Sequence, residues 1–184
     1  ERGIRAGGRV AGVGAAGAGQ TTLMHLRGGR DRASSGSVQF AETNIVRYSA
    51  QGLDAFRNRA IGFVFQFHQL LPEFSALENV MMPALIGRSL AKEAEAKASE
   101  ILTAVGLGHR LDHKPGQLSG GEQQRVAIAR SLIRTPKLLF ADELTGNLGS
   151  AISDEILALL DRLHAERDLT IIVVTHSKKV AGHM

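Results

Sequence analysis

Apolar residues follow two patterns along this chain, and the first is a set of short continuous runs. Runs rich in β-branched and aromatic residues are typical of strands, and nearly unbroken ones are typical of buried parallel strands. We therefore predict strands within residues 10–14, 35–40, 60–66, 137–142 and 169–176. The most apolar of these are the last two, KLLFAD and LTIIVVTH.

The second pattern is helical spacing, which dominates residues 72–134. Residues 90–107 are a predicted helix closed by Gly106, with an apolar face made of Leu90, Ala94, Ala98, Ile101, Leu102 and Val105. Residues 153–166 are a second amphipathic helix, whose inward face is Ile156, Leu159, Leu160 and Leu163. A further helix is predicted to begin near Thr21 and to end by Gly28.

Alternating strands and helices predict an α/β fold, with a parallel sheet flanked by helices. The 184 residues are enough for one such domain. We expect residues 1–69 and 135–184 to form its core and residues 70–134 to form an inserted helical subdomain. The first nine residues, ERGIRAGGR, are polar and glycine-rich, and they predict a frayed or truncated start rather than a stable element.

Composition excludes several classes of protein. The absence of cysteine rules out disulfides and thiolate metal sites, and it suits a reducing cytoplasm. No apolar run approaches the roughly 20 residues that cross a bilayer, so membrane association is expected to come through a partner. The net charge of +4 is mildly basic, but one tyrosine, no tryptophan and no long basic run disfavour nucleic-acid binding.

The first candidate for chemistry is a glycine-rich loop, GVGAAGAGQTTLMHL, at residues 12–26. It fits the phosphate-binding pattern G-x-x-x-x-G-K-[ST] at every place but one, because Gln20 stands where the lysine is expected. Glycines let backbone N–H groups turn around an anion, and the following helix adds its N-terminal dipole. The candidate nucleotide-binding residues are Gly14, Ala15, Ala16, Gly17, Ala18, Gly19, Gln20, Thr21 and Thr22. The alternative is a glycine-rich turn without a ligand.

Gln20 changes what this loop can do. An amide still donates hydrogen bonds, but it brings no charge to the terminal phosphates. Hydrogen bonds to charged groups contribute about 1.5–3 kcal/mol against about 1 for neutral ones, so phosphate affinity falls around tenfold. The loss in rate is expected to be larger, because negative charge builds up in the transition state.

The second candidate is QLSGGEQQRVAIARSLIR, residues 117–134. Ser119 and Glu122 have the spacing of a capping box, in which the serine caps the helix and the glutamate reaches back. Gly120 and Gly121 leave the helix N-terminus bare, so that its amides can face an anion. An ordinary well-capped helix is the alternative.

Residues 118–130, LSGGEQQRVAIAR, resemble the signature sequence of ATP-binding cassette (ABC) ATPases nearly letter for letter. Other motifs of that family follow in its order: Gln66 resembles the Q-loop glutamine, LLFADE at 138–143 the Walker B motif, TGNL at 145–148 the D-loop, and His176 the switch histidine. The resemblance covers residues 12–177 and implies a P-loop NTPase (RecA-like) core that binds ATP and Mg²⁺.

Physical chemistry suggests a role for each of these side chains. Asp142 ends a buried strand, where its carboxylate can hold Mg²⁺ together with Thr21 and Gln66. Glu143 is the candidate to orient and deprotonate the attacking water, with a surface glutamate as the alternative. His176 ends a strand of a parallel sheet, at the edge where ligands bind, and is the candidate to hydrogen-bond the γ-phosphate.

The resemblance also implies partners. Ser119, Gly120, Gly121 and Glu122 would close over the nucleotide in the phosphate loop of a second copy, giving a homodimer with two ATP molecules between its subunits. Residues 65–87 and 104–122 are most similar to ATPase subunits of lipoprotein-releasing transporters, with macrolide-export and cell-division ATPases as near relatives. That similarity implies integral membrane permease subunits as partners and a place at the cytoplasmic face of the bacterial inner membrane.

Several positions depart from the family pattern. Besides Gln20, these are the alanines of the phosphate loop, Leu144 in place of a proline, Gly149 in place of the D-loop aspartate, and Ser177 in place of an acidic residue. Nothing before Gly12 supplies the aromatic residue that stacks on adenine, and the strands after the switch are missing, so both ends are expected to be truncated. Three readings remain: a hydrolysing transporter subunit, a hydrolysis-impaired nucleotide-binding partner subunit, and an ABC ATPase that acts on DNA or ribosomes.

Overall fold

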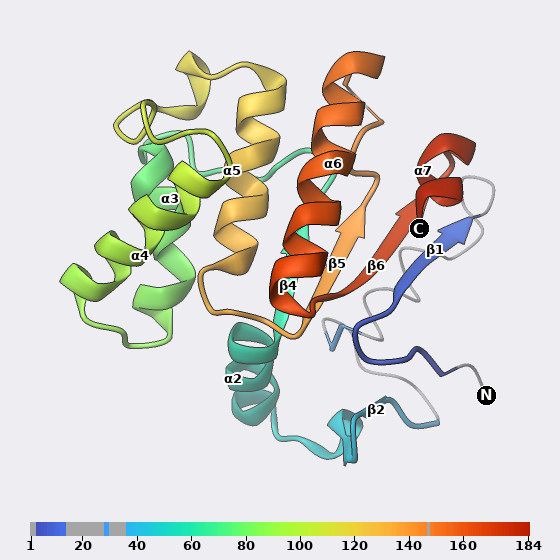
Figure 1. The fold of residues 1–184 in the computed structure, drawn as a ribbon. Coiled ribbons are helices and arrows are strands. Elements are labelled where there is room, and N and C mark those ends of the chain that lie inside the picture. The colour runs from blue at the N-terminus through green and yellow to red at the C-terminus, as the bar shows by residue number, and fades with distance from the viewer. Residues whose placement is uncertain (1–2, 14–27, 30–35, 147) are drawn as a thin grey trace.

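The computed structural model describes residues 3–13, 28–29, 36–146 and 148–184. Its centre is a four-stranded parallel sheet in the order β1-β6-β5-β4 (Figure 1). The strands are β1 (Arg9–Val13), β4 (Ile61–Val64), β5 (Leu138–Asp142) and β6 (Thr170–Thr175). Three of them lie within runs predicted as strands, β1 begins one residue before its predicted run, and the α/β class with a parallel sheet is confirmed.

The remaining predicted strand lies outside this sheet. β2 (Gln39–Phe40) pairs antiparallel with β3 (Thr43–Asn44) in a separate two-stranded ribbon. A 3₁₀ turn, η1 (Ile45–Arg47), and helix α2 (Ala50–Ala60) follow the ribbon. The sequence pattern missed α2, because its apolar face is short: Phe56 is its single buried residue, and only Leu53 and Ala60 of the helix pack beside it.

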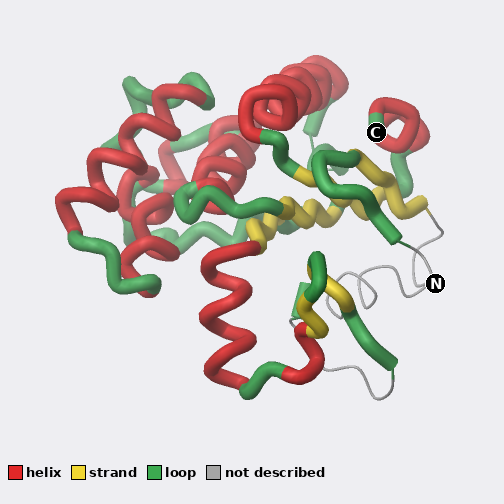
Figure 2. Tube along the Cα trace, turned by 60° about the horizontal axis from the view of Figure 1, so that its bottom comes forward, coloured by secondary structure: helices red, strands yellow, loops and turns green. Residues whose placement is uncertain are grey.

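The sheet is apolar on both faces because its side chains alternate between two cores. Leu139, Ala141, Ile171 and Val173 belong to the larger core. Four helices complete that core: α3 (Ala76–Ile86), α4 (Ala91–Ala104), α5 (Gly120–Leu132) and α6 (Ser150–Arg167). Leu138, Phe140 and Ile172 belong to a smaller core, with Phe56 of α2 and Ile45 of η1. Figure 2 shows α6 on one side of the sheet and α2, with the ribbon, on the other.

A 3₁₀ turn, η2 (Pro115–Gln117), precedes α5, and a short helix, α7 (Lys178–His183), follows β6. Helices α3, α4 and α5 pack against one another and gather beside the β4 edge of the sheet (Figure 1). Among the described residues, no helix combines the length and the apolar character that a bilayer crossing needs.

The apolar faces predicted for two helices are largely confirmed. Ile156, Leu159, Leu160 and Leu163 are all buried on α6. On α4 the predicted face is buried with one exception, Leu90, which is 68 % exposed. Leu90 is the N-cap of the helix, so its side chain lies before the first helical turn rather than on the buried face. Gly106 has a φ of +84°, as expected for a residue that ends a helix.

The prediction of a frayed start is wrong for residues 7–9. The N–H of Gly7 donates to Thr170 Oγ1 at 2.9 Å, and the carbonyl of Gly8 accepts from the N–H of Ile171 at 3.0 Å. Arg9 begins β1 opposite Ile171 and forms an ion pair with Asp161 of α6. Pairing with β6 orders this polar segment, although its own side chains give no apolar pattern.

We predict that Gly149→Asp stabilises the protein. Gly149 is the N-cap of α6 with φ −61° and ψ 158°, and an added side chain meets nothing within 4 Å. A carboxylate there accepts a hydrogen bond from the first turn and faces the positive end of the helix dipole. Relative to glycine we expect a gain of about 0.5 kcal/mol, or roughly 1–2 °C in melting temperature.

Thermal unfolding of Gly149→Asp beside Gly149→Ala tests this expectation. Alanine adds the same Cβ but no hydrogen-bond acceptor, so its melting temperature should stay level or fall. If alanine stabilised the protein as much as aspartate did, capping would not be the cause.

Candidate functional site

The carboxyl ends of the strands place three predicted residues at one edge of the sheet. Parallel register sets Val64 opposite Ala141, Asp142 opposite Val174, and Val13 opposite Thr175. Gln66 therefore leaves the sheet two residues after β4, Glu143 immediately after β5, and His176 immediately after β6. Ligands of open parallel sheets bind outside this edge, which is where the sequence reasoning expected the chemistry.

Glu143 is the best-fixed of these side chains. It is 7 % exposed and has a φ of +48°, so the chain turns sharply where β5 ends. Its N–H donates to the carbonyl of Val174 at 2.8 Å, which ties the turn to β6. The alternative of a surface glutamate is therefore wrong, since this carboxylate is enclosed.

The Glu143 carboxylate turns back onto the end of β6. Oε1 accepts from Thr175 Oγ1 at 3.0 Å, and Oε2 accepts from the backbone N–H of His176 at 3.0 Å. The Nδ1 of His176 also lies 3.0 Å from Oε2. Hydrogen bonds to a carboxylate are stronger than neutral ones, so these contacts fix both oxygens.

Thr175 is a functional contact that sequence reasoning missed. Its side chain is almost fully buried, and its hydroxyl oxygen accepts from the N–H of Ser177 at 3.0 Å. With that acceptor position occupied, the hydroxyl hydrogen is directed toward Glu143. The signal in the sequence was a hydroxyl residue ending a buried strand directly before His176.

His176 and Asp142 stand nearer to solvent than Glu143. The His176 side chain is 71 % exposed, so its ring has an accessible face above the sheet edge while Nδ1 contacts Glu143. Asp142 is half-buried at the end of β5, and Gln66 is half-buried beyond β4. The edge thus combines one enclosed carboxylate with an exposed imidazole and two partly exposed oxygen-bearing side chains.

The predicted capping box is present at the start of α5. Ser119 Oγ accepts from the N–H of Glu122 at 3.3 Å, and Glu122 Oε2 accepts from the N–H of Ser119 at 2.8 Å. These bonds from Ser119 lower the pKa of the Glu122 carboxyl, and Arg110, 3.2 Å away, acts in the same direction. Glu122 therefore remains ionised, and its carboxylate contacts the N–H of Ser119 and the Arg110 guanidinium.

The two glycines of this cap also have a packing role. Gly121 is buried, and a Cβ there would come within 2.7 Å of Ile152 Cγ2. At Gly120, which is exposed, a Cβ would lie 3.4 Å from Leu148 Cδ2. The close approach of α5 to the start of α6 thus requires glycine at position 121, beyond any contact with an anion.

The glycine-rich loop lies outside the described residues. This applies to Gly14, Ala15, Ala16, Gly17, Ala18, Gly19, Gln20, Thr21 and Thr22, and to the helix expected from Thr21. Their roles stay predictions from the sequence.

Two departures from the family pattern have local structural explanations, and a third, Gly149, has none. Leu144 is 2 % exposed and belongs to the larger core. Ser177 caps α7, because its hydroxyl accepts from the N–H of Val180 at 3.4 Å. Gly149 caps α6 without a side chain.

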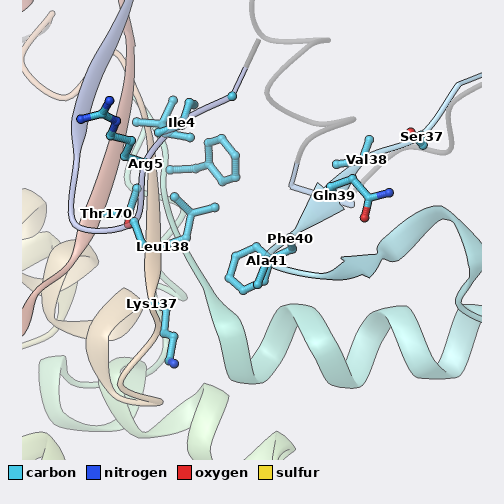
Figure 3. A pocket seen from close by; sticks show the side chains of 14 residues that line it. Ile4, Arg5, Ser37, Val38, Gln39, Phe40, Ala41, Lys137, Leu138 and Thr170 are labelled. Atoms are coloured by element: carbon cyan, nitrogen blue, oxygen red, sulfur yellow. The ribbon is translucent and has the colours of Figure 1, made fainter. Parts of the chain in front are cut away.

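A cavity of about 660 Å³ opens at the opposite edge of the sheet (Figure 3). Lys137, Leu138 and Thr170, at the amino ends of β5 and β6, line it together with Ile4, Val38 and Phe40. It therefore lies away from Glu143 and His176, and a ligand in it would not reach them.

Comparison with known proteins gives consistent matches. A family model described as "ABC transporter" matches residues 2–146. A relative from Syntrophotalea carbinolica named "Lipoprotein-releasing system ATP-binding protein LolD" is 61 % identical over 97 % of this chain and 79 % of the relative. One of the same name from Geobacter metallireducens is 55 % identical over 98 % of this chain and 80 % of its own length.

Solved structures agree with these matches. The dimeric post-hydrolysis structure of the ATP-binding cassette MJ0796 bound to ADP and Pi superposes with a TM-score of 0.89 at 36 % identity. A second dimeric structure of MJ0796, described as a bacterial ABC transporter cassette, gives the same values. Both alignments cover 99 % of this chain and 80 % of the matched chain.

We predict that Gly146→Ala destabilises the protein by displacing Glu143. The added Cβ would lie 2.6 Å from Glu143 Cγ, and the carboxylate cannot retreat without breaking its bonds to β6. Overpacking of this kind costs about 1–3 kcal/mol. Differential scanning calorimetry should show a lower melting temperature.

Gly182→Ala is the matched control. It lies in α7, where an added Cβ meets nothing within 4 Å, so its melting temperature should hold or rise. Equal destabilisation by both variants would contradict a specific clash with Glu143.

Proposed function

The chain belongs to the ABC transporter family, and from this membership we propose that it is the ATP-binding and hydrolysing subunit of a transporter that releases lipoproteins from the bacterial inner membrane. The main support for ATP hydrolysis is the enclosed Glu143 carboxylate in contact with His176. The transport part rests on the names of relatives that match nearly the whole chain.

Glu143 acts as the general base in this proposal. A base must sit within hydrogen-bond reach of the proton that it accepts, in a site from which bulk water is excluded. Glu143 is buried and is therefore screened from bulk water. Its carboxylate comes within reach of the attacking water when it turns from Thr175 toward the sheet edge. His176, with an exposed ring, hydrogen-bonds the γ-phosphate and keeps contact with Glu143.

Mg²⁺ would be held by Asp142, Gln66 and Thr21. Carboxylate, amide and hydroxyl oxygens are the hard ligands that this ion prefers, and it keeps several waters. Asp142 and Gln66 fit, because both leave adjacent strands at the same edge and neither is fully buried. When bound, the ion neutralises charge on the terminal phosphates.

The phosphates themselves would be bound by residues 14–22. The loop glycines and the start of the helix at Thr21 supply backbone donors, and Gln20 supplies a neutral side-chain donor. Because the lysine is replaced, a hydrolysis-impaired partner subunit is the second candidate function, favoured by Gln20 and opposed by the intact Glu143 and His176.

The signature residues would act across a homodimer. Ser119, Gly120, Gly121 and Glu122 lie at the start of α5, and in the proposed assembly they close over the nucleotide held by the partner. The dimeric state of the two matched cassette structures supports this arrangement.

Membrane permease subunits would dock beside Gln66. The segment that follows carries Phe67, Leu71 and Phe74, whose exposed fractions are 75 %, 41 % and 37 %. Exposed aromatic and aliphatic side chains in one segment are typical of interaction surfaces. The subunit would thus sit peripherally at the cytoplasmic face of the inner membrane. Macrolide-export and cell-division complexes are the alternatives within the same family.

We predict that Gln20→Lys raises both affinity and turnover. The restored charge should tighten ATP binding about tenfold. It should raise the catalytic rate constant by more, because the phosphate charge grows in the transition state. Isothermal titration with ATP and a phosphate-release assay measure the two effects.

Glu143→Gln in the Gln20→Lys background is the control, since it should bind ATP without releasing phosphate. Equal activity of the unmodified chain and Gln20→Lys would show that the lysine is dispensable here.

Mixing two inactive variants tests the shared site, again in the Gln20→Lys background. Ser119→Arg blocks the signature surface and Glu143→Gln removes the base, so each alone should be inactive. If each site combines Glu143 of one subunit with Ser119 of the other, a mixed dimer keeps one intact site. An equal mixture should then recover roughly a quarter of the parent activity, because half of the dimers are mixed.

Glu143→Gln mixed with His176→Ala is the negative control, because these residues serve the same subunit's site. Recovery in the control, or none in the test mixture, would argue against signature residues acting in trans.

A further inference from the structure

The segment after Gln66 adopts a backbone that ordinary residues seldom adopt. His68 and Gln69, neither of them glycine, have φ values of +53° and +49°. The N–H of His68 donates to the carbonyl of Phe65 at 3.0 Å, so Gln66 lies inside a closed turn. Left-handed backbone at such residues is disfavoured and persists only where the surroundings hold it.

Arg130 of α5 is the side chain that holds it. Its Nη1 donates to the carbonyl of Gln69 at 2.6 Å, and its Nη2 donates to the carbonyl of His68 at 2.7 Å. A planar guanidinium that binds two neighbouring acceptors fixes their direction as well as their distance. Burial lowers the pKa of Arg130, as expected for a cation enclosed by this turn.

A second contact joins the same turn to the same helix nearer its start. Gln123, about two turns before Arg130, hydrogen-bonds with the His68 ring through its side chain. Its Nε2 donates to the carbonyls of Pro115 and Leu118 at 3.1 Å. Leu118 directly precedes Ser119, so Gln123 also holds the chain just before the cap of α5.

Within the part of the chain that the structure describes, α3 holds a different part of this segment. Asn79 of α3 holds the next part of the segment, because its buried amide donates to the carbonyls of Leu71 and Phe74 and accepts from the N–H of Leu71. Arg130 is therefore the side-chain donor that the structure assigns to residues 68 and 69.

We propose that Arg130 is a positioning residue that locks the turn containing Gln66 onto α5, so that the Gln66 side chain and the Ser119 cap move as one unit. This rests on the role of Gln66 in the proposed function.

The lock predicts a local effect that does not depend on catalysis. In Arg130→Met, which keeps an apolar stem but no donor, hydrogen exchange at residues 66–70 should quicken about tenfold while the rest of α5 stays protected. Arg130→Lys keeps the charge but cannot bind two carbonyls in a plane, so it should give an intermediate effect.

Arg125→Lys is the matched control. Arg125 lies on the same helix and also makes two contacts, to the carbonyl of Val105 at 3.0 Å and to Glu155 at 2.7 Å. It does not reach the turn, so exchange at residues 66–70 should not change. Unchanged exchange in Arg130→Met, or an equal change in Arg125→Lys, would overturn the proposal.

Kinetics in the Gln20→Lys background separate positioning from general stability. Arg130→Met should lower kcat about tenfold, because a displaced Gln66 misplaces the metal and water, while the Kd for ATP stays within about twofold. Arg125→Lys should change neither value. A parallel loss of ATP affinity in Arg130→Met would indicate a structural role only and would count against the lock.

Different results would contradict the proposed function and the proposed role of Arg130. If the Gln20→Lys protein released no phosphate, the proposed function would be contradicted, and the exchange measurement would still decide whether Arg130 locks the turn.

Discussion

The parallel pairing of β5 with β6 is the constraint on which the site depends. It sets Asp142 beside Val174, so that the next residue, Glu143, can bond to the Val174 carbonyl and turn its carboxylate onto Thr175 and His176. A slip of one residue would reverse the faces of the strand and separate these groups. The buried alternation of Leu139 and Ala141 against Leu138 and Phe140 makes that slip costly, because each set fills a different core.

Helix α5 is the second constraint, and it acts over a longer distance. Its first turn carries Ser119, and its last turns carry Arg130, with a buried apolar face between them. Residues that contact α5 at either end therefore share one rigid body. Hydrogen bonds from Arg130 attach the turn after Gln66 to α5, and Leu70 adds apolar packing against the larger core.

The sequence was sufficient for the elements whose apolar residues are numerous and regular. The strands around 139 and 172 and the helix around 160 could be read from periodicity alone. Helix α2 could not, since Phe56 is its single buried residue. The order at Gly7 and Gly8 comes from a strand 163 residues further along the chain. Motif order identified Glu143 and His176, but it gave no hint of Thr175 or Arg130, whose roles arise from backbone turns at Glu143, His68 and Gln69.

The departures from the family pattern do not have a common cause. Leu144 fills core volume, Ser177 caps α7, and Gly149 leaves α6 with a weaker cap, so each is a local choice that the fold accommodates. Gln20 lies outside the described residues, and its amide carries no charge where a lysine would bring one to a phosphate. Glu143 is held by hydrogen bonds from Thr175 Oγ1 and from the N–H of His176, with His176 Nδ1 3.0 Å from Oε2, so the carboxylate at the sheet edge keeps a defined position. In the proposed function, therefore, the charge at position 20 is what separates a weak ATPase from a strong one, because the enclosed Glu143 carboxylate is present in either case.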